Sequence, residues 1–407
     1  KLIERMRQID LSADVRVLFS QPTLAALAAA VGGHTDVQVP DNLIVPGCER
    51  ITPDMLPLAD LDQAAIDRVV ASVPGGLANI QDIYALAPLQ EGILYHHISA
   101  EQGDPYVLQA QFAFDSRAHL DSFAQALQTV INRHDILRTS MHWESLDEPL
   151  QVVWRQVELS VEEIQLNPRF GDISRQLQER LDPRQIRMDI RQAPLMRLVC
   201  ALDSGNERWV ATLMFHHMIL DHTALDQVRY EMQVCLRGQA EQLADSIPYR
   251  NYVAQARLGL KEQDHELFFQ DMLGDIDEPT LPFGLHDVQG DGNAIDQARL
   301  TLDNALSQRL RVQTRQLGVS AASLLHLAFA QMLGRLSGRD QVVFGTVLMG
   351  RMQSGEGAER ALGMFINTLP LRVDLGGEGV RDGVKATHRR LTGLLGHEHA
   401  SLALAQR

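Results

Sequence analysis

The chain has 407 residues, 45% of them hydrophobic and 22% charged, so it is long enough for two or more packed globular domains. Its formal net charge of −15 argues against nucleic-acid binding, because a phosphate-binding surface needs clustered lysine and arginine. The three scattered cysteines, Cys48, Cys200 and Cys235, are too few for a disulfide framework or a zinc site, which fits a reducing cytoplasm.

Residues 1–31 are the first predicted structural piece. Apolar stripes predict three short helices there, and Pro22 is expected at the first position of the third helix. The charged N-terminus does not resemble a signal peptide. Residues 32–75 are rich in proline and mostly lack periodicity, which predicts a linker that ends with one helix at 61–73.

Strands and helices alternate through the remainder of the chain, and this alternation predicts the α/β class. In the first part, the predicted strands are residues 106–114, 138–143 and 150–154, the predicted hairpin joins 195–202 to 209–215, and the predicted helices are 120–131 and 223–236. In the second part, the predicted helices are residues 248–272, 305–317 and 320–336, and the predicted strands are 298–302, 341–347 and 366–373. The recurrence of these elements predicts two similar lobes. The most apolar helical segment, residues 321–333, is too short to cross a bilayer.

The strongest chemical signal lies where the strand at 209–215 meets the helix at 223–236. His216 and His217 are adjacent there, and because successive strand side chains face opposite ways, only one of them can face a cavity. A neutral imidazole near pH 7 can accept a proton or orient a donor. The spacing does not fit a zinc-binding helix, so no metal is expected. The alternative is that these are two ordinary histidines among the 15 of the chain.

Asp221 immediately precedes the predicted helix at 223–236. This position favours a buried carboxylate that is paired with an arginine, for which Arg138 and Arg351 are the candidates. Its expected role is to hold the loop in place rather than to react.

Four segments resemble, in the same order, motifs of nonribosomal peptide synthetase condensation domains and, more broadly, of chloramphenicol-acetyltransferase-like acyltransferases. The segments read RHDILRT at 133–139, HHMILD at 216–221, PYRNYV at 248–253, and GR at 350–351 followed by GMFINTL at 363–369. The resemblance covers residues 82–407. It implies that His217 is catalytic, with His216 and Asp221 beside it, and that Arg138, Arg351 and Asn367 line the substrate channel or support it.

The same resemblance implies the architecture. Two chloramphenicol-acetyltransferase-like lobes, residues 76–240 and 241–407, are expected to form a V-shaped pseudo-dimer with a channel between them. The second lobe is expected to be incomplete at its end. Position 222 departs from the family pattern, because His222 stands where the general motif has glycine. His222 is therefore expected either to adopt a strained backbone or to mark a subfamily variation.

A further motif distinguishes a subfamily. Residues 88–104 contain His96, His97 and Ile98, followed after four residues by Gly103 and Asp104. This HHIxxxxGD pattern resembles that of dual epimerization/condensation domains, and ordinary condensation domains lack it. A helix from Pro88 would carry both histidines in its last turn about 100° apart, so only one is expected to enter the channel. The alternative is that both are helix C-terminal histidines favoured by the helix dipole.

Residues 1–31 resemble the C-terminal helices of a peptidyl carrier (thiolation) domain. The carrier serine that holds 4′-phosphopantetheine is absent, so this cofactor is expected on the donor and acceptor carriers and not bound covalently within this chain. The implied partners are an upstream donor carrier, a downstream acceptor carrier and the adenylation domain of the same megasynthase, with neither nucleic acid nor membrane.

The implied function is a pair of reactions in nonribosomal peptide synthesis. The donor thioester would be inverted at Cα from L to D and then joined to the amine of the acceptor, with His96 or His97 cooperating with His217. Two alternatives stay open. One is a condensation domain without epimerase activity, and the other is a degenerate condensation-like module that only docks carriers or tailoring enzymes.

Overall fold

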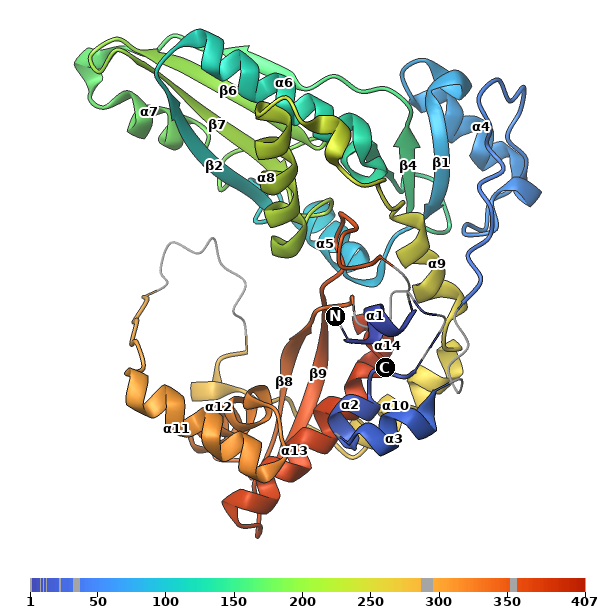
Figure 1. Cartoon of the computed structure of the whole chain (residues 1–407), viewed down its shortest axis with the longest axis vertical. Helices are drawn as coiled ribbons and strands as arrows, with labels where there is room; N and C mark the ends of the chain where they lie inside the picture. The colour runs from blue at the N-terminus through green and yellow to red at the C-terminus, as the bar shows by residue number, and fades with distance from the viewer. Residues whose placement is uncertain are drawn as a thin grey trace. The chain divides into compact units, whose positions relative to one another are not determined.

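The computed structural model describes residues 2–7, 9, 11, 13–21, 23–31, 37–286, 296–351 and 357–406. The chain divides into two compact units (Figure 1). The histidine unit consists of Val37–Gly259 and Gly357–Phe365, and the terminal unit consists of Lys1–Asp36, Leu260–Glu356 and Ile366–Arg407. The compact units divide between Gly259 and Leu260. The lobe boundary expected between residues 240 and 241 stays a prediction.

Two sheets form the framework of the histidine unit. A four-stranded sheet has the order β2 (Val107–Phe114), β7 (Arg208–His216), β6 (Met196–Asp203) and β5 (Ser160–Glu163). A three-stranded sheet has the order β1 (Ile80–Ala85), β4 (Leu150–Trp154) and β3 (Thr139–His142). The expected hairpin at 195–215 is confirmed as the antiparallel pair β6 and β7. Because β2 pairs with β7 in the register Val107 to His216, the loop before β2 lies beside the end of β7.

Among the described residues, six α-helices accompany these two sheets in the histidine unit. They are α4 (Gln63–Ser72), α5 (Pro88–Ser99), α6 (Arg117–Arg133), α7 (Ile173–Arg180), α8 (His222–Leu236) and α9 (Arg250–Leu258). Helix α6 buries Leu120, Leu127, Val130 and Ile131 at helical spacing, which gives it one apolar face for the core. It packs against α8, so the two helices lie side by side (Figure 1).

The terminal unit has a smaller sheet among the described residues. Strands β8 (Gln341–Leu348) and β9 (Asn367–Asp374) pair antiparallel. The surrounding helices are α10 (Glu262–Leu273), α11 (Asn304–Leu317), α12 (Ala321–Ser337), α13 (Val380–Leu395) and α14 (Leu402–Ala405). Their shared core includes Leu327, Leu369 and Leu371.

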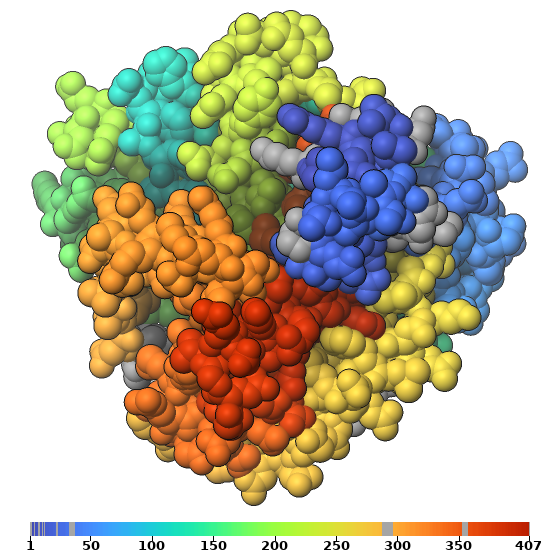
Figure 2. Space-filling model, turned by 60° about the horizontal axis from the view of Figure 1, so that its bottom comes forward, coloured from blue at the N-terminus to red at the C-terminus, as the bar shows by residue number. Residues whose placement is uncertain are grey.

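Three N-terminal helices belong to the terminal unit. They are α1 (Leu2–Arg7), α2 (Val17–Ser20) and α3 (Leu24–Ala30), and they share a small core of Ile3, Ala13, Val15 and Leu27. In the space-filling view these helices lie against the C-terminal part of the chain (Figure 2). A buried histidine of α13, His388, connects α13 to α2, because its Nε2 is hydrogen-bonded to the carbonyl oxygen of Phe19 at 3.0 Å.

Three predicted elements are wrong in detail. The long helix at 248–272 is interrupted between α9 and α10. Gly259 ends α9, at a position where an added Cβ would lie 2.5 Å from the carbonyl oxygen of Gln255. Residues 298–302 form no strand, and the side chain of Leu300 is 87% exposed there. The third N-terminal helix begins at Leu24, with Thr23 as its cap, and not at residue 22 as expected. Pro22 itself lies outside the described residues.

The remaining predicted helices and strands are found with ends shifted by a few residues. Strand β1 was not expected, nor were β5, α7 and α13. No single helix in the described ranges is long and apolar enough to cross a membrane. Helices α11 and α12 pass that test only when they are taken together, and they meet at 107°.

Candidate active site

The histidine motif begins at the last residue of β7. His216 is fully buried with no exposed surface, whereas His217 is only half-buried, as the strand alternation predicts. The backbone is fixed on both sides, because the His216 N–H donates to Leu195 and the His217 N–H donates to the carbonyl of Tyr106 at 2.8 Å. The Nδ1 atom of His217 is buried and has no hydrogen-bond partner among the described residues. The part of the His217 side chain that stays exposed therefore does not include Nδ1.

A backbone hydrogen bond decides the proton position of His216. The N–H of Met218 donates to Nδ1 of His216 at 3.1 Å, so Nδ1 is an acceptor and the ring hydrogen must be on Nε2. Nε2 lies 3.0 Å from Oδ2 of Asp104 and donates to it. Burial lowers the pKa of His216, although the neighbouring Asp104 carboxylate opposes this. His216 is thus held as the neutral Nε2–H tautomer.

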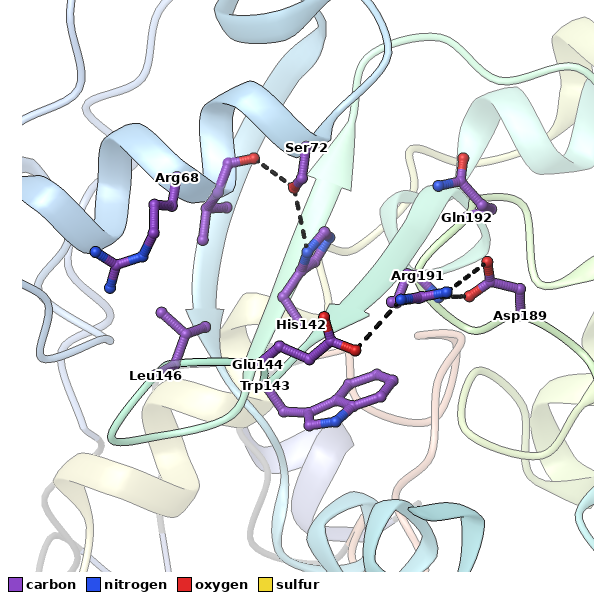
Figure 3. Close-up of a pocket in the computed structure, with 10 residues that line it drawn as sticks. Arg68, Ser72, His142, Trp143, Glu144, Leu146, Asp189, Arg191 and Gln192 are labelled. Carbon is purple, nitrogen blue, oxygen red and sulfur yellow. Dashed lines mark hydrogen bonds and ion pairs between the residues drawn. The ribbon is translucent and has the colours of Figure 1, made fainter. Parts of the chain in front are cut away.

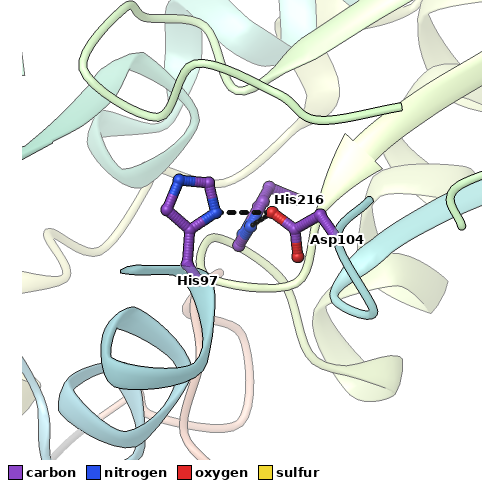
Figure 4. A group of neighbouring side chains, drawn as sticks. All are labelled: His97, Asp104 and His216. Atoms are coloured by element: carbon purple, nitrogen blue, oxygen red, sulfur yellow. Dashed lines mark hydrogen bonds and ion pairs between the residues drawn. The ribbon is translucent and has the colours of Figure 1, made fainter. Parts of the chain in front are cut away.

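Asp104 connects the two histidine pairs. Its Oδ2 atom lies 2.6 Å from Nδ1 of His97 and 3.0 Å from Nε2 of His216 (Figure 4). Burial disfavours ionisation of Asp104, but the bonds from His216 and His97 outweigh burial and hold the pKa of this carboxyl below its usual range. An ionised carboxylate only accepts, so Nδ1 of His97 must donate.

The same three side chains carry donor atoms within 4.8 Å of one another, close enough to suggest a metal site. Ligands around a tetrahedral zinc ion lie roughly 3.3–3.6 Å apart, whereas His97 and Asp104 are separated by 2.6 Å, a hydrogen-bond distance. In addition, His216 cannot offer a lone pair at Nε2 while Met218 donates to Nδ1. The cluster therefore fits a hydrogen-bonded triad better than a metal centre.

The loop before β2 places Asp104 between the histidines. Gly103 has a φ of +66°, and a side chain at this position would overlap the carbonyl of Arg184. The N–H of Asp104 donates to the carbonyl of Pro183 at 2.8 Å, and its Oδ1 accepts the N–H of Tyr106 at 2.9 Å. The GD pair of the motif thus provides a tight turn followed by a fixed acceptor.

Helix α5 presents its two histidines differently. His97 is 4% exposed and faces the triad, whereas His96 is exposed, with its ring 6.0 Å from the ring of Tyr106. The two rings therefore face different ways, and which of them enters the channel stays a prediction. At the other end of α5, the buried Gln90 donates to the carbonyl of Met218 at 2.8 Å. Both ends of the helix are consequently tied to the loop that carries His217.

Asp221 is buried and caps α8 by accepting the N–H of Ala224 at 2.7 Å. It also holds the late motif: its N–H donates to Gly363 at 3.1 Å, and its Oδ2 accepts the N–H of Phe365 at 3.3 Å. This agrees with the expected role of fixing a loop. The pairing with Arg351 stays a prediction, because Arg351 belongs to the terminal unit.

Two tyrosines of the 248–253 motif support the same segment. The hydroxyl of Tyr249 donates to Met364 at 2.5 Å, and the hydroxyl of Tyr252 donates to Phe365 at 3.1 Å. The backbone N–H of Tyr249 is in turn bound by the buried carboxylate of Asp135 at 2.9 Å. Motifs that are far apart in the sequence therefore meet around Asp221.

The 133–139 motif has a structural part in this arrangement. Arg133 and His134 both bind Glu231 of α8, at 3.1 and 2.9 Å. Arg138 donates to Gln81 at 2.9 Å and to the carbonyl of Trp154, which joins it to β1 and β4. These bonds do not support Arg138 as the partner of Asp221.

Neither Asn367 nor His222 is a member of the triad. Asn367 begins β9 in the terminal unit, where its amide donates to the carbonyls of Glu398 and Ala400 at 2.9 and 2.7 Å. His222 is the first residue of α8 and is exposed. It is not among the described non-glycine residues with positive φ, so of the two expectations for His222 the strained backbone is wrong and the subfamily variation stays a prediction.

A pocket of about 240 Å³ lies next to the triad (Figure 3). Trp143 lines it and also meets the ring of His97 edge-on, with ring centres 6.3 Å apart. His142 lines it too, and burial with the nearby Arg191 lowers the pKa of His142 to about 4. None of the four motif histidines lines this pocket, so it does not supply the reaction space.

Sequence reasoning missed two residues of the site. Asp104 has no assigned role in the sequence motif, although a short acidic side chain after glycine is a signal for a fixed acceptor. Gln90 gave no signal, since a glutamine in a helix is normally on the surface. Its complete burial comes from the packing of α5 against the loop after β7.

Known proteins resemble this chain in sequence. The sequence pattern described as Condensation domain matches residues 80–404. Malpinin synthetase of Mortierella alpina is 51% identical over 407 residues, which cover 100% of this chain and 5% of the synthetase. A linear gramicidin synthase protein of Brevibacillus parabrevis is 34% identical over 368 residues, which cover 86% of this chain and 5% of that protein. The chain therefore spans about a twentieth of the length of these relatives.

Solved structures agree on the fold. The first condensation domain of the CDA synthetase aligns with a TM-score of 0.59 at 20% identity, over 78% of this chain and 76% of that one. The condensation domain from Monacolin K polyketide synthase MokA aligns with a TM-score of 0.61 at 19% identity, over 81% and 76% of the two chains. The predicted chloramphenicol-acetyltransferase-like α/β fold is confirmed. From the extent of the sequence match, this chain belongs to the condensation domain family of nonribosomal peptide synthetases.

Proposed function

We propose that this condensation domain performs two reactions: it inverts the Cα of a carrier-bound donor from L to D, and it then forms the peptide bond to the acceptor amine. The observation that carries the proposal is the position of Asp104. This residue of the HHIxxxxGD motif bonds His97 of the same motif and His216 of the HHxxxD motif. The motif that distinguishes the dual subfamily is thereby part of the same site as the motif for condensation.

Condensation needs little base catalysis. The amine nitrogen of the acceptor attacks the thioester carbonyl, the C–N bond forms, and the C–S bond breaks to release the phosphopantetheine thiol. A neutral amine is already a good nucleophile, so His217 acts mainly by orienting it and by moving its proton towards the leaving sulfur. The partial exposure of His217, next to the fully buried His216, supports this role.

Epimerization needs more acid–base catalysis than condensation does. The Cα hydrogen of a thioester is a weak acid, and inversion removes a proton from one face and returns one to the other. Two groups on separate segments meet this requirement, and the structure has two histidine-bearing segments joined by Asp104. We assign His217 to one face and a histidine of the α5 pair to the other.

The proposal includes the neighbours of the domain. Donor and acceptor carriers would each deliver a substrate on 4′-phosphopantetheine, and an adenylation domain would load them, in a reducing cytoplasm that leaves the three cysteines free. Residues 1–31 would be the C-terminal helices of the donor carrier, followed by the linker at 32–75. Their separate small core of Ile3, Ala13, Val15 and Leu27 supports this assignment.

A stereochemical assay tests the function. The chain is incubated with an acceptor carrier and with a donor carrier that holds either the L- or the D-configured aminoacyl thioester, and the dipeptide is analysed on a chiral column. The expected product contains a D-configured donor residue from both substrates. Deuterium from the solvent should appear at Cα of the product made from the L-donor, because inversion removes the original Cα proton and returns one that comes from the solvent. Product with a retained L-donor residue and no deuterium would show that the domain condenses without epimerizing.

A condensation domain without epimerase activity is the second candidate. The burial of His97 at 4% exposure favours it, because a buried ring can serve structure alone. The stereochemical assay separates the two candidates, and alanine substitution tests the part of the α5 histidines in inversion. If His96→Ala and His97→Ala both leave D-configured product formation intact, the α5 histidines have no part in inversion.

A further inference from the structure

We propose that Asp104 is a positioning residue shared by both reactions, and that His97 acts through Asp104 while the exposed His96 is the α5 histidine that touches the donor. This inference rests on the proposed function and assigns its residues. Asp104 and His97 would keep His216, and through it the His217 backbone, in one arrangement. The two motifs would then each contribute one buried and one accessible histidine.

The ring hydrogens of His216 and His97 have determined positions. Met218 fixes the hydrogen of His216 on Nε2, and the ionised Asp104 accepts it. The same oxygen accepts the Nδ1 hydrogen of His97 at 2.6 Å. The two ring hydrogens that face Asp104 are thus determined by one backbone N–H and one carboxylate. Asp104 is itself fixed by the N–H of Tyr106 on its other oxygen.

Accessibility then separates the two α5 histidines. A group that removes a Cα proton must come within hydrogen-bond reach of it, so geometry is considered before basicity. The side chain of His97 is 5% exposed and is enclosed by Asp104, His216 and the ring of Trp143. His96 is exposed, and its ring neighbours that of Tyr106, whose carbonyl accepts the backbone N–H of His217. His96 and His217 are therefore both adjacent to the same residue.

Asparagine cannot replace Asp104. If its amide nitrogen faced the histidines, the nitrogen would oppose the fixed Nε2 hydrogen of His216. If its oxygen faced them, the amide nitrogen would oppose the N–H of Tyr106. Either orientation leaves two donors in contact.

An asparagine at position 97 behaves differently from one at position 104. Its amide nitrogen takes the place of Nδ1 and still donates to Asp104, while it lacks any basic nitrogen.

The experiment uses these substitutions in the full chain. Condensation alone is measured with a D-configured donor carrier, and both reactions are measured together with the L-configured donor. We expect Asp104→Asn and His97→Ala to slow condensation of the D-donor by about 10- to 100-fold, in line with the loss of a buried charge-assisted hydrogen bond. His97→Asn should recover most of both rates. His96→Ala should lose D-product from the L-donor selectively, and Ser99→Ala, at the exposed end of α5, serves as the matched control.

One result would overturn the inference. If His97→Asn and His97→Ala both condense the D-donor at the wild-type rate yet make no D-product from the L-donor, His97 is the base that touches the substrate. Imidazole ¹⁵N spectra of the unmodified chain provide a second measurement that needs no variant. They should show His216 as a neutral Nε2–H ring at pH 7, and a ring with both nitrogens protonated at that pH contradicts the proton arrangement.

The failure of the proposed function gives a different result. In that case the unmodified chain makes no D-product from the L-donor, while the effects of Asp104→Asn and His97→Asn on condensation are still measurable with whichever donor is accepted. Asp104 is then a positioning residue for condensation alone if its substitution slows that reaction and His97→Asn does not. Equal rates for all variants contradict the inference whatever the donor.

Discussion

A single backbone N–H determines the chemistry available to His216. Because Met218 donates to Nδ1, the ring can neither take up a second proton there nor offer a lone pair at Nε2. His216 is therefore an orienting donor, which is consistent with our proposal that His217 moves the proton. The sequence shows two adjacent histidines, and strand alternation predicts that they differ. The identity of the partner that makes them different is visible only in the structure.

His222 permits a prediction at the residue scale. It begins α8 with a helical backbone and an exposed ring, so restoring the family glycine removes no strain. We expect His222→Gly to change the free energy of unfolding by less than about 1 kcal/mol, since glycine costs little in a first helical turn. The rate of condensation should stay within roughly threefold of the wild-type rate. Urea denaturation and a product assay by mass spectrometry measure both quantities, with His217→Ala as the inactive control. A tenfold loss of rate would assign His222 a role in the reaction.

Among the helices and strands, α5 connects the segments that carry the two histidine motifs. Its N-terminal Gln90 bonds the loop after β7, and its C-terminal His97 bonds Asp104. The helix and the positions of both histidines could be predicted from Pro88 and the following pattern. The contacts could not, because Asp104 reaches His216 only through the pairing of β2 with β7. The break between α9 and α10 was missed for a similar reason, since both helices have apolar faces in one continuous pattern.

Two glycines of the first motif should respond oppositely to alanine. Gly103 has a positive φ and lies against the carbonyl of Arg184, so Gly103→Ala should destabilise the chain by about 1–3 kcal/mol and displace Asp104. Gly92 lies inside α5, where an added methyl group meets nothing within 4 Å. Gly92→Ala should therefore stabilise the chain by about 0.5–1 kcal/mol. Thermal unfolding with a condensation assay compares the two. Equal stability of the variants would contradict the fixed turn at Gly103.

At the scale of the whole molecule, the two compact units differ in how much sheet they contain. The histidine unit has a four-stranded sheet in which β6 and β7 are buried along most of their length. The described part of the terminal unit has the two-stranded pair β8 and β9, and β8 alternates between buried and exposed positions. A short sheet with an exposed face opens more readily than a central pair of strands.

This difference predicts an order of hydrogen exchange. Backbone amides of β6 and β7 should exchange most slowly, and those of β8 and β9 should exchange faster by an amount equivalent to at least about 1–2 kcal/mol of opening free energy. Native-state exchange followed by mass spectrometry of peptides resolves the two pairs, and the helices α6 and α8 serve as an internal reference. Equal protection of both strand pairs would show that the units open as one cooperative body.

The sequence by itself determined the α/β class, most of the helices and strands, and the two histidine motifs, because hydrophobic periodicity and adjacent chemical groups are local properties. It also placed Asp221 at a helix start, where it is found as the cap of α8. The tertiary structure decided which groups meet. Asp104 lies between His97 and His216, and Asp221 binds the segment at Gly363, because strand pairing and tyrosine packing bring together residues more than 100 positions apart. No local pattern contains such distances, so the assignment of a role to each histidine had to wait for the fold.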